Sequence, residues 1–266
     1  MSDRVLVSVA DGVADVRLNR PEKLNALDSA MFRALTDAGE SLKERSDVRA
    51  VVLSGEGRSF CAGLDFSSFQ AMGDSQDTKD KPDAVDHLEG RITHLGQQAT
   101  WVWQELDVPV IGAISGHALG GGFQLAMGPD IRLVHPDTKM SILEIRWGLV
   151  PDMGASVLLP PLVGLDVTKE LYFTGRMISG TEAVELGVAT RISDNPHADA
   201  LDLAKEIAEK NPDAIRRMKT ILNGLTERNT AERFAAEREH IGALIGSPNQ
   251  MEAVSAFFEK RTPKFS

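Results

Sequence analysis

The 266-residue sequence predicts an α/β fold whose strands pair mainly in parallel, followed by an all-helical C-terminal region. Short apolar runs alternate with helical segments up to about residue 195, and this alternation is typical of a sheet covered by helices. From about residue 196 the strand signals vanish and helical segments follow one another. We therefore predict a core over residues 1–195 and a helical region over residues 196–266.

The first elements are predicted to be a hairpin and a helix. Two β-rich runs lie within residues 4–19, and Asp11-Gly12 between them is a strong hairpin signal. Asp28 is expected to cap a helix that runs to about residue 44. The apolar residues of this helix recur on one face: Met31, Leu35, Ala38 and Leu42.

The central strands are predicted as three short apolar runs, over residues 49–55, 109–116 and 130–134. Helical segments near residues 84–106 and 120–128 separate them. Short apolar runs of this kind are consistent with strands that are buried on both faces of a parallel sheet.

The C-terminal region is expected to contain four helices. Three of them begin where a capping residue precedes a proline, at Asn195-Pro196, Asn211-Pro212 and Ser247-Pro248. The helices are predicted near residues 196–210, 212–225, 230–245 and 248–259. Because their apolar faces are too small to form a core alone, we expect them to pack on the main domain or on a neighbouring subunit.

The composition argues against several classes of protein. Asp and Glu outnumber Lys and Arg by 39 to 29, and the formal net charge of −10 argues against a nucleic-acid partner. The single cysteine, Cys61, rules out an intramolecular disulfide and indicates a reducing compartment. The sequence shows neither an apolar run long enough for a membrane span nor a signal-peptide pattern. We therefore expect a cytoplasmic protein without a membrane partner.

The segment GGGFQLAM, residues 120–127, suggests a phosphate-binding glycine loop but lacks the required spacing. Its three contiguous glycines do not fit G-x-G-x-x-G, and no Lys-Ser/Thr pair follows them. The six histidines show no metal-ligand spacing either. The remaining interpretation is acid–base chemistry supported by free backbone N–H groups, which glycines expose to a ligand. Tight packing between a strand and a helix is the alternative explanation of the glycines.

Three further segments resemble the crotonase family, the enoyl-CoA hydratases and isomerases: RPEKLNAL (20–27), SFCAGLDF (59–66) and EIRWGLVPDMGA (144–155). The resemblance continues through residues 171–192 and 256–265, so it covers nearly the whole chain. It implies a crotonase-type ββα superhelical core, a C-terminal oligomerisation region, and trimers that commonly pair into hexamers. It also implies an acyl-CoA thioester substrate, a role in fatty-acid β-oxidation or a related route, and no metal or redox cofactor, since coenzyme A is part of the substrate.

The resemblance implies that two backbone N–H groups, those of Leu64 and Gly121, hold the thioester carbonyl oxygen. Negative charge gathers on this oxygen when a proton leaves the α-carbon or when water adds to the double bond. Preorganised donors stabilise that charge, and one such donor is typically worth about 10²–10³ in rate. The resemblance further implies a set of coenzyme A contacts: Lys23, Ala26, Ala62, Asp65, Phe66, Ser67, Phe257 and Lys260. The last two match positions that often act across a subunit boundary, and for Lys260 an ordinary surface lysine is the alternative.

Family hydratases use two glutamates, and this sequence keeps one of them. Glu144 matches the second, but the first position holds Gln124, which has no titratable proton and cannot act as a general base. Asp152 matches an aspartate that the family's dienoyl-CoA isomerases pair with their glutamate. In that scheme Glu144 takes a proton from C2 and Asp152 returns one further along the acyl chain. A helix N-cap is the alternative role for Asp152.

These residues place double-bond isomerisation first, because isomerases that shift one double bond work with a single glutamate. Hydration of 2-enoyl-CoA comes second, with Gln124 orienting the water. A non-catalytic acyl-CoA-binding homologue comes third, and Glu144 argues against it, since a pure binder has no need of a carboxylate facing the α-carbon. An unrelated nucleotide-binding α/β protein is disfavoured, because its glycine loop would follow the first strand.

Overall fold

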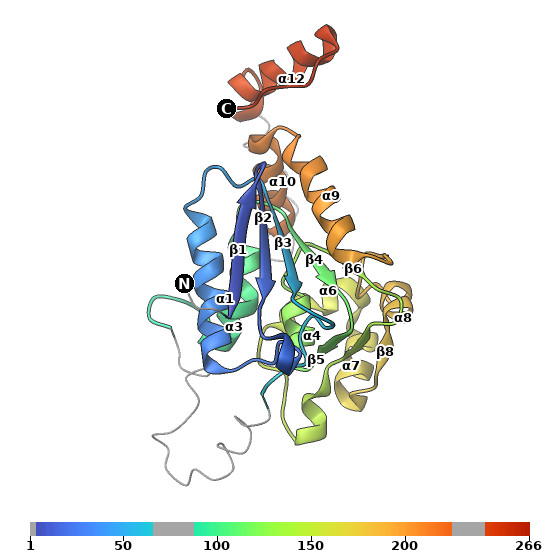
Figure 1. The fold of residues 1–266 in the computed structure, drawn as a ribbon. Helices are drawn as coiled ribbons and strands as arrows, with labels where there is room; N and C mark the ends of the chain where they lie inside the picture. Colours follow the sequence, from blue (N-terminus) through green and yellow to red (C-terminus); the bar gives the residue numbers. More distant parts are fainter. Residues whose placement is uncertain (1–3, 66–87, 225–242) are drawn as a thin grey trace.

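The structure is a computed structural model that describes residues 4–65, 88–224 and 243–266. Within these residues a six-stranded sheet forms the centre, in the order β1-β2-β3-β4-β6-β9 (Figure 1). Its strands are β1 (Val5–Ala10), β2 (Val13–Leu18), β3 (Ala50–Gly55), β4 (Val110–Ile114), β6 (Ile131–Val134) and β9 (Arg191–Ile192). The pair β1–β2 is antiparallel and the other neighbours are parallel. The predicted α/β class with central parallel strands is therefore confirmed.

A two-residue turn joins β1 to β2. Ala10 pairs with Val13, which leaves Asp11 and Gly12 as the turn residues. Their φ angles are 52° and 77°, the left-handed region that hairpin turns require and that aspartate and glycine tolerate. The predicted hairpin is confirmed.

Helices cover both faces of the sheet (Figure 1): α1 (Ser29–Lys43) and α3 (Leu95–Glu105) on one face, and α9 (Pro196–Ala208) on the other. The side chains of β3 show the division. Val51 and Leu53 belong to the cluster that contains α1 and α3, whereas Ala50 and Val52 pack with α9. Successive residues of a strand point to opposite faces, so a strand covered on both sides is apolar throughout. This explains the uninterrupted apolar run from which β3 was predicted.

The helix starts depend on side-chain caps. Asp28 caps α1 as predicted, because its Oδ1 accepts a hydrogen bond from Met31 N at 2.8 Å. The helix α3 starts at Leu95 rather than near residue 84, and residues 84–87 lie outside the described residues. A reciprocal pair of hydrogen bonds between His94 and Gln97 forms a capping box at this start. Histidine is not a usual capping residue, so no local pattern marks this boundary.

A second, three-stranded sheet was not predicted. It contains β5 (His117–Leu119), β7 (Lys139–Ser141) and β8 (Ile178–Ser179), each too short to show a period of two. The short helices are η1 (Pro21–Lys23), α4 (Gly121–Ala126), η3 (Leu143–Trp147), α5 (Ala155–Leu158), α6 (Pro160–Val163), α7 (Leu165–Thr174) and α8 (Gly180–Glu185). Among the described helices, none is both long and apolar enough to cross a membrane.

The helix α9 belongs to the core by its packing. Ala200, Ala204 and Ala208 lie on one face of the helix and are buried against residues of β3, β4 and β6. Their small side chains let the helix approach the sheet closely. The helical region predicted from residue 196 thus contributes one layer of the core through α9, in line with the expectation that it packs on the main domain.

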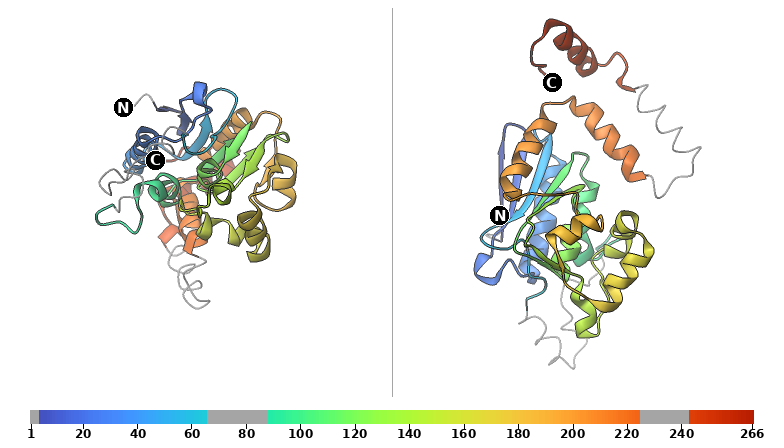
Figure 2. Two further views of the ribbon diagram at one scale, coloured as in Figure 1. Left: turned by 90° about the horizontal axis from the view of Figure 1, so that it is seen from below. Right: turned by 90° about the vertical axis from the view of Figure 1, so that its right-hand side faces the viewer.

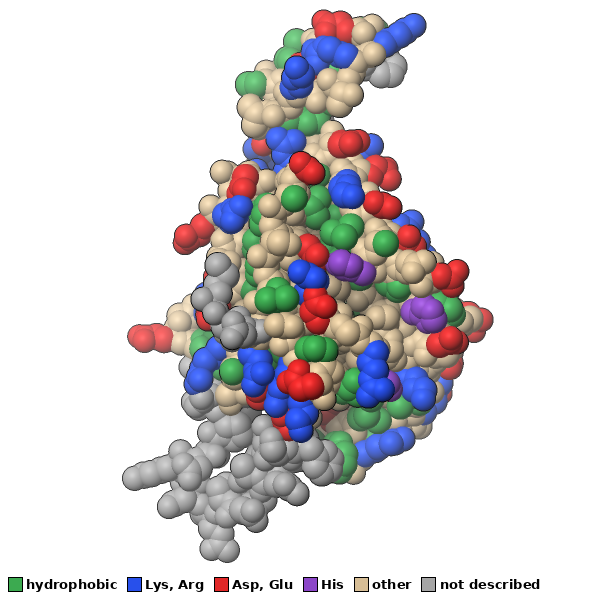
Figure 3. Space-filling view, viewed as in Figure 1, with side chains coloured by type: hydrophobic (Ala, Val, Ile, Leu, Met, Phe, Trp, Pro, Cys, Tyr) green, Lys and Arg blue, Asp and Glu red, His purple; other side chains and the backbone are tan. Residues whose placement is uncertain are grey.

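The last helices extend beyond one end of the sheet. Asn211 caps α10 (Pro212–Asn223) as predicted, whereas Asn195 makes no side-chain cap bond at α9. The helix α12 (Pro248–Glu259) projects from the rest of the molecule in Figure 1 and in the right-hand view of Figure 2, and it forms a separate lobe in the space-filling view (Figure 3). Most of the helix predicted over residues 230–245 lies outside the described residues.

The candidate site lies at the edge of the sheet where the parallel strands end. Because β2, β3, β4 and β6 run in the same direction, the loops that follow them meet at this edge. The opposite end of the sheet, where the parallel strands begin, faces α12. There Arg49, which directly precedes β3, donates from Nη2 to the carbonyl of Phe265 at 3.2 Å. The C-terminal lobe and the candidate site therefore lie at opposite ends of the sheet.

Lys219 fastens α10 to the body of the protein. Its Nζ lies 2.8 Å from Asp130 Oδ2 and donates to the carbonyls of Trp103 at 3.1 Å and Val108 at 2.9 Å. The residue is 7% exposed, and this burial lowers the pKa of its ammonium group. The carboxylate and the two carbonyls compensate for the lost hydration.

We expect Lys219→Met to lower the free energy of unfolding by about 3 kcal/mol, because Asp130 and two carbonyls lose a buried partner. Urea unfolding at pH 7 measures the change. Lys210→Met is the matched control, since Lys210 lies 3.8 Å from Glu206 in an exposed pair. The control should change stability by less than about 0.5 kcal/mol. Equal losses in the two variants would contradict the anchoring role of Lys219.

Candidate active site

Asn25 fixes the loop between residues 20 and 27. It is fully buried and has a φ of 57°, a left-handed conformation that asparagine tolerates better than most residues. Its Oδ1 accepts from Arg20 N at 2.8 Å, and its Nδ2 donates to the carbonyls of Glu56 at 3.0 Å and Ser59 at 2.8 Å. Asn25 therefore ties the loop after β2 to the loop after β3.

A buried ion pair joins the same two loops at a second point. Arg20 Nη1 lies 2.5 Å from Asp65 Oδ2, and the two side chains are 11% and 8% exposed. The same nitrogen donates to the carbonyl of Ala26 at 3.1 Å. The side chain of Asp65 is thus engaged inside the protein, so the predicted contact with coenzyme A would have to come from its backbone.

The N–H group of Leu64 points away from the strand that Leu64 pairs with. Leu64 forms an isolated parallel bridge with Leu27, in which Leu27 N donates to Gly63 O at 2.7 Å and Asp65 N donates to Leu27 O at 2.9 Å. Successive backbone groups of an extended chain point to opposite sides. The N–H of Leu64 therefore faces away from Leu27, and it donates to no backbone carbonyl among the described residues.

The N–H group of Gly121 is unengaged in the same way. Gly120 has a φ of 53° and a ψ of −120°, a conformation open mainly to glycine, and its own N–H donates to Ser141 O at 2.8 Å. The chain then enters α4, whose first N–H groups have no partner within the helix. Gly121 N donates to no backbone carbonyl in the described part of the chain.

The two segments that carry these N–H groups are in contact. A Cβ atom at Gly63 would lie 2.5 Å from Leu119 O and 3.8 Å from Gly121 N. Gly63 also has a φ of 92°, so glycine is required there both by backbone conformation and by the close approach. Both predicted donors thus lie on adjoining loops, and neither N–H group donates to a backbone carbonyl of residues 4–65, 88–224 or 243–266, as an oxyanion hole requires.

Glu144 lies beside the glycine turn and is hydrogen-bonded to Gln124. A Cβ atom at Gly120 would lie 3.6 Å from Glu144 Oε1, and Gln124 Nε2 donates to that oxygen at 2.7 Å. Gln124 Oε1 accepts from Met153 N at 2.7 Å and from Ala155 N at 3.5 Å. Both ends of this fully buried amide are therefore occupied, and they fix the orientation of the Glu144 carboxylate.

The second oxygen of Glu144, Oε2, is buried and has no hydrogen-bond partner among the described residues. Burial raises the pKa of the Glu144 carboxyl, the charge of Asp152 adds to this effect, and hydrogen bonds from the Glu144 backbone and from Gln124 oppose it. Glu144 is therefore a stronger base than an ordinary glutamate, and Oε2 is the atom available to exchange a proton.

Asp152 does not cap the helix that follows it. The N-cap of α5 is Gly154, with no side-chain cap hydrogen bond. The Asp152 carboxylate is half exposed, and its Oδ2 lies 3.9 Å from His94 Nε2. The capping interpretation of Asp152 is therefore wrong, and its charge acts on Glu144. The active-site role of Asp152 stays a prediction.

The other predicted contacts with coenzyme A fall into two groups. In the loops that follow β2 and β3, Lys23 is exposed, Ala62 is half-buried and Ala26 is buried. Phe66 and Ser67 lie outside the described residues.

Two further predicted contacts belong to the C-terminal lobe. Lys260 is exposed and directly follows α12, at the end of the sheet opposite to Glu144 (Figures 1 and 2). Phe257 lies within α12, and its side chain is not among those that the structure describes. In a single chain Lys260 is therefore remote from the candidate site, and the predicted contact requires a second subunit.

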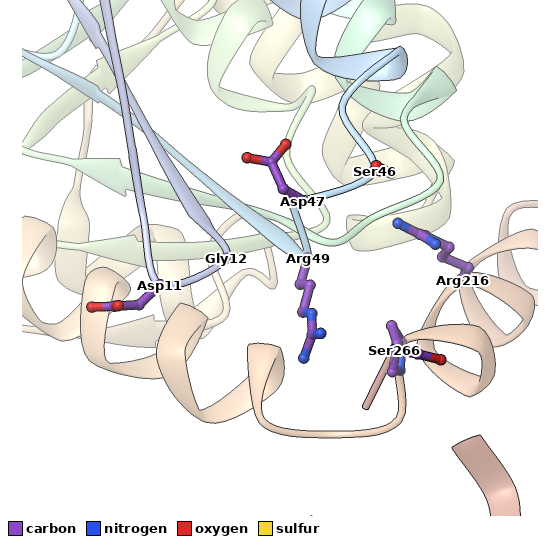
Figure 4. A pocket seen from close by; sticks show the side chains of 8 residues that line it. Asp11, Gly12, Ser46, Asp47, Arg49, Arg216 and Ser266 are labelled. Carbon is purple, nitrogen blue, oxygen red and sulfur yellow. The ribbon is translucent and has the colours of Figure 1, made fainter. Parts of the chain in front are cut away.

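Two surface pockets formed by the described residues do not include Glu144. A polar one of about 320 Å³ lies near the amino ends of β2 and β3 (Figure 4) and is lined by Asp11, Gly12, Ser46, Asp47, Arg49, Pro212, Arg216 and Ser266. A mainly apolar one of about 560 Å³ is lined by residues of α10 together with Trp101, Met127 and Leu162. Neither includes Glu144, Gln124 or Gly121, so the chemistry of the residues and not the size of a hollow identifies the site. No three His, Cys, Asp or Glu side chains form a metal-binding group within the described ranges.

Comparison with known proteins identifies the family. The family model described as enoyl-CoA hydratase/isomerase matches residues 8–266. The chain belongs to this family. Its crotonase fold is confirmed by a crystal structure of enoyl-CoA hydratase from Bacillus anthracis, with a TM-score of 0.88, 28% sequence identity, and coverage of 98% of both chains.

Individual relatives match this chain over nearly its whole length. The short-chain-enoyl-CoA hydratase of Clostridium acetobutylicum is 32% identical over 265 residues, which cover 97% of this chain and 96% of the relative. The human protein named enoyl-CoA hydratase domain-containing protein 2, mitochondrial, is 33% identical over 269 residues, which cover 98% of this chain and 88% of the relative. An enzyme of enoyl-CoA hydratase/isomerase type acting on an acyl-CoA thioester fits these findings.

Three residues of the site were not predicted from the sequence. Asn25 and Arg20 lie within the segment RPEKLNAL, but the pattern did not show that they hold two loops together. Tyr172 lies on α7, and its hydroxyl is buried near Glu144. Nothing in the sequence pointed to Tyr172, because its place near Glu144 arises from the packing of α7 against η3.

We expect Glu144→Gln to be at least as stable as the parent protein at pH 7. The new amide oxygen still accepts from Gln124, while the charge that burial disfavours is removed. The pKa of Glu144 is raised in the folded state, so the parent loses stability as the pH rises from 4.5 through that raised pKa, and the variant does not. Urea unfolding at several pH values between 4.5 and 8 should show the difference growing with pH in favour of the variant. A difference that shrinks as the pH rises would contradict the raised pKa.

Proposed function

We propose that this protein shifts a carbon–carbon double bond in an enoyl-CoA or dienoyl-CoA thioester, with Glu144 as the acid and base. The observation that carries the proposal is the state of Gln124. Its amide is occupied at both ends, by Glu144 Oε1 and by Met153 N, and it cannot ionise. The site therefore has one buried carboxylate where a two-acid hydration requires a pair.

The backbone N–H groups of Leu64 and Gly121 would hold the thioester oxygen. Loss of a proton from C2 moves the electron pair into the conjugated system and places negative charge on that oxygen. Two preorganised donors stabilise this enolate without reorganisation, each by a factor of about 10²–10³ in rate. The donors belong to the backbone, so the side chain at position 64 is free to vary.

Glu144 would move the proton through Oε2. In a 3-enoyl substrate this oxygen takes a proton from C2, the double bond shifts from C3–C4 to C2–C3, and the same carboxyl returns the proton to C4. A single group suffices because the two carbons lie on the same short stretch of the acyl chain. In a 3,5-dienoyl substrate the proton returns further along the chain, and Asp152 is the proposed second acid.

Hydration of 2-enoyl-CoA is the second candidate function. The names of relatives such as the short-chain-enoyl-CoA hydratase of Clostridium acetobutylicum favour it. Glu144 alone would then have to activate the water, since the Gln124 amide is already engaged. A non-catalytic acyl-CoA binder is disfavoured by the raised pKa of Glu144, because a binder has no use for a desolvated base.

Several accompanying features remain part of the proposal. The coenzyme A contacts, the absence of a metal or redox cofactor, assembly into trimers or hexamers and a cytoplasmic location all rest on the sequence and on the family. The place of Lys260, beyond the opposite end of the sheet, supports assembly if this residue contacts coenzyme A.

Turnover of three substrates distinguishes the candidate reactions. We expect the purified protein to convert 3-enoyl-CoA or 3,5-dienoyl-CoA faster than it hydrates 2-enoyl-CoA. Glu144→Gln should lower kcat for the preferred substrate by about 10²–10⁴, the usual contribution of a general base. Asp152→Asn should abolish dienoyl conversion only, leaving the single shift of 3-enoyl-CoA. Rapid hydration of 2-enoyl-CoA would overturn the ranking, and tight binding without turnover of any substrate would support the non-catalytic homologue.

Gln124→Glu should shift the acid limb of the pH–rate profile to higher pH by about one unit or more. Two carboxyl groups within hydrogen-bond distance cannot both ionise easily, and Met153 N favours the charged form at position 124. Glu144 would then hold its proton to higher pH and lose activity as a base. Gln250→Glu, which adds the same charge on α12 while keeping the acceptor for Gly246 N, is the control and should leave the profile unchanged. An unshifted limb in Gln124→Glu would show that Glu144 is not the titrating base.

A further inference from the structure

Tyr172 is the one tyrosine in the sequence, and its hydroxyl is buried next to the candidate site. The Oη atom has no hydrogen-bond partner among the described residues. A buried hydroxyl without a partner destabilises the fold, so such a group in a functional region calls for a role.

The end of α7 is fixed against the segment that carries Glu144. Ser141 Oγ donates to the carbonyl of Gly175 at 2.9 Å, and a Cβ atom at Gly175 would lie 2.8 Å from Ile145 Cγ2. Gly175 follows the last turn of α7, and Tyr172 lies within that turn. The packing therefore places the last turn of α7, which carries Tyr172, beside η3, which carries Glu144.

The charge of Glu144 acts on Tyr172, which agrees with the packing of α7 against η3. Burial, together with the charge of Glu144, raises the pKa of Tyr172 to about 12. The phenol is therefore neutral, and able to donate a hydrogen bond, throughout the pH range in which Glu144 changes its charge. Asp152 is the other charged group that acts on Glu144, and His94 lies beside that aspartate.

We propose that Tyr172 is a positioning residue for Glu144, whose Oε2 accepts a hydrogen bond relayed from the Tyr172 hydroxyl by one water. This bond provides a partner for two buried polar atoms at once. Gln124 holds one oxygen of the carboxylate and Tyr172 holds the other, while the second lone pair of Oε2 stays free for the proton of the substrate. The inference rests on the proposed function in taking Glu144 as the base, but the hydrogen bond itself can be observed without turnover.

The sole tyrosine allows a direct spectroscopic test in the full-length protein. Labelling tyrosine with ¹³C at Cζ gives one signal, which should be absent from Tyr172→Phe. Between pH 4.5 and 9 we expect its chemical shift to change in one step, with a midpoint above the ordinary value for glutamate. The step should vanish in Glu144→Gln and persist in Asp152→Asn. A signal that does not change with pH, or that keeps its step in Glu144→Gln, would overturn the proposal.

Kinetics provide the second test on whichever substrate is converted. Tyr172→Phe should move the acid limb of kcat to higher pH by about one unit, because the ionised carboxylate loses a donor, and should leave KM within about twofold. Phe173→Leu, on the exposed neighbouring position, is the control and should leave the limb in place. An unmoved limb in Tyr172→Phe would contradict the positioning role. If no substrate is converted, the proposed function fails, and the NMR titration alone decides whether the hydrogen bond exists.

Discussion

The hydrogen bond from Gln124 to Glu144 is the interaction on which the arrangement of the site depends. It occupies one carboxylate oxygen, sets the direction of the other, and links η3 to α4 at the glycine turn. The opposite end of the same amide holds the backbone at Met153. One uncharged side chain thus positions the base, the start of the oxyanion segment and the chain that leads to Asp152. Because glutamine does not titrate, Gln124 offers the same donor to Glu144 at every pH.

The loops around the base are held by polar groups that are themselves buried. Asn25 and the Arg20–Asp65 pair connect the loop after β2 to the loop after β3. A β-bridge between Cys61 and Ala118 connects the latter loop to β5, which leads into the glycine turn. Loops that carry function are usually mobile, and a site that stabilises a transient charge must keep its donors in place. The buried connections provide that rigidity at the edge of a sheet whose own core is apolar.

The sequence allowed much of the fold and of the site to be predicted, for physical reasons that differ between elements. The hairpin at Asp11-Gly12 and the cap at Asp28 are local signals, so the chain around them is sufficient to recognise them. The strands of the second sheet are too short to carry a period, and the His94 cap of α3 is an unusual choice of residue. Glu144 and Gln124 were recognised from their place in family motifs. Tyr172 could not be recognised, because its relation to Glu144 depends on how two helices pack and not on any spacing along the chain.

The way in which Met153 N and Ala155 N bind Gln124 also bears on how such a protein could change its chemistry over evolution. Both donors meet an oxygen, and a carboxylate oxygen would fit the same place as the amide oxygen. Glutamine and glutamate have almost the same shape, so a single nucleotide change could add a second acid without moving the backbone. The scaffold is therefore compatible with one-acid and two-acid chemistry, and members of the family could pass from one to the other without refolding the site.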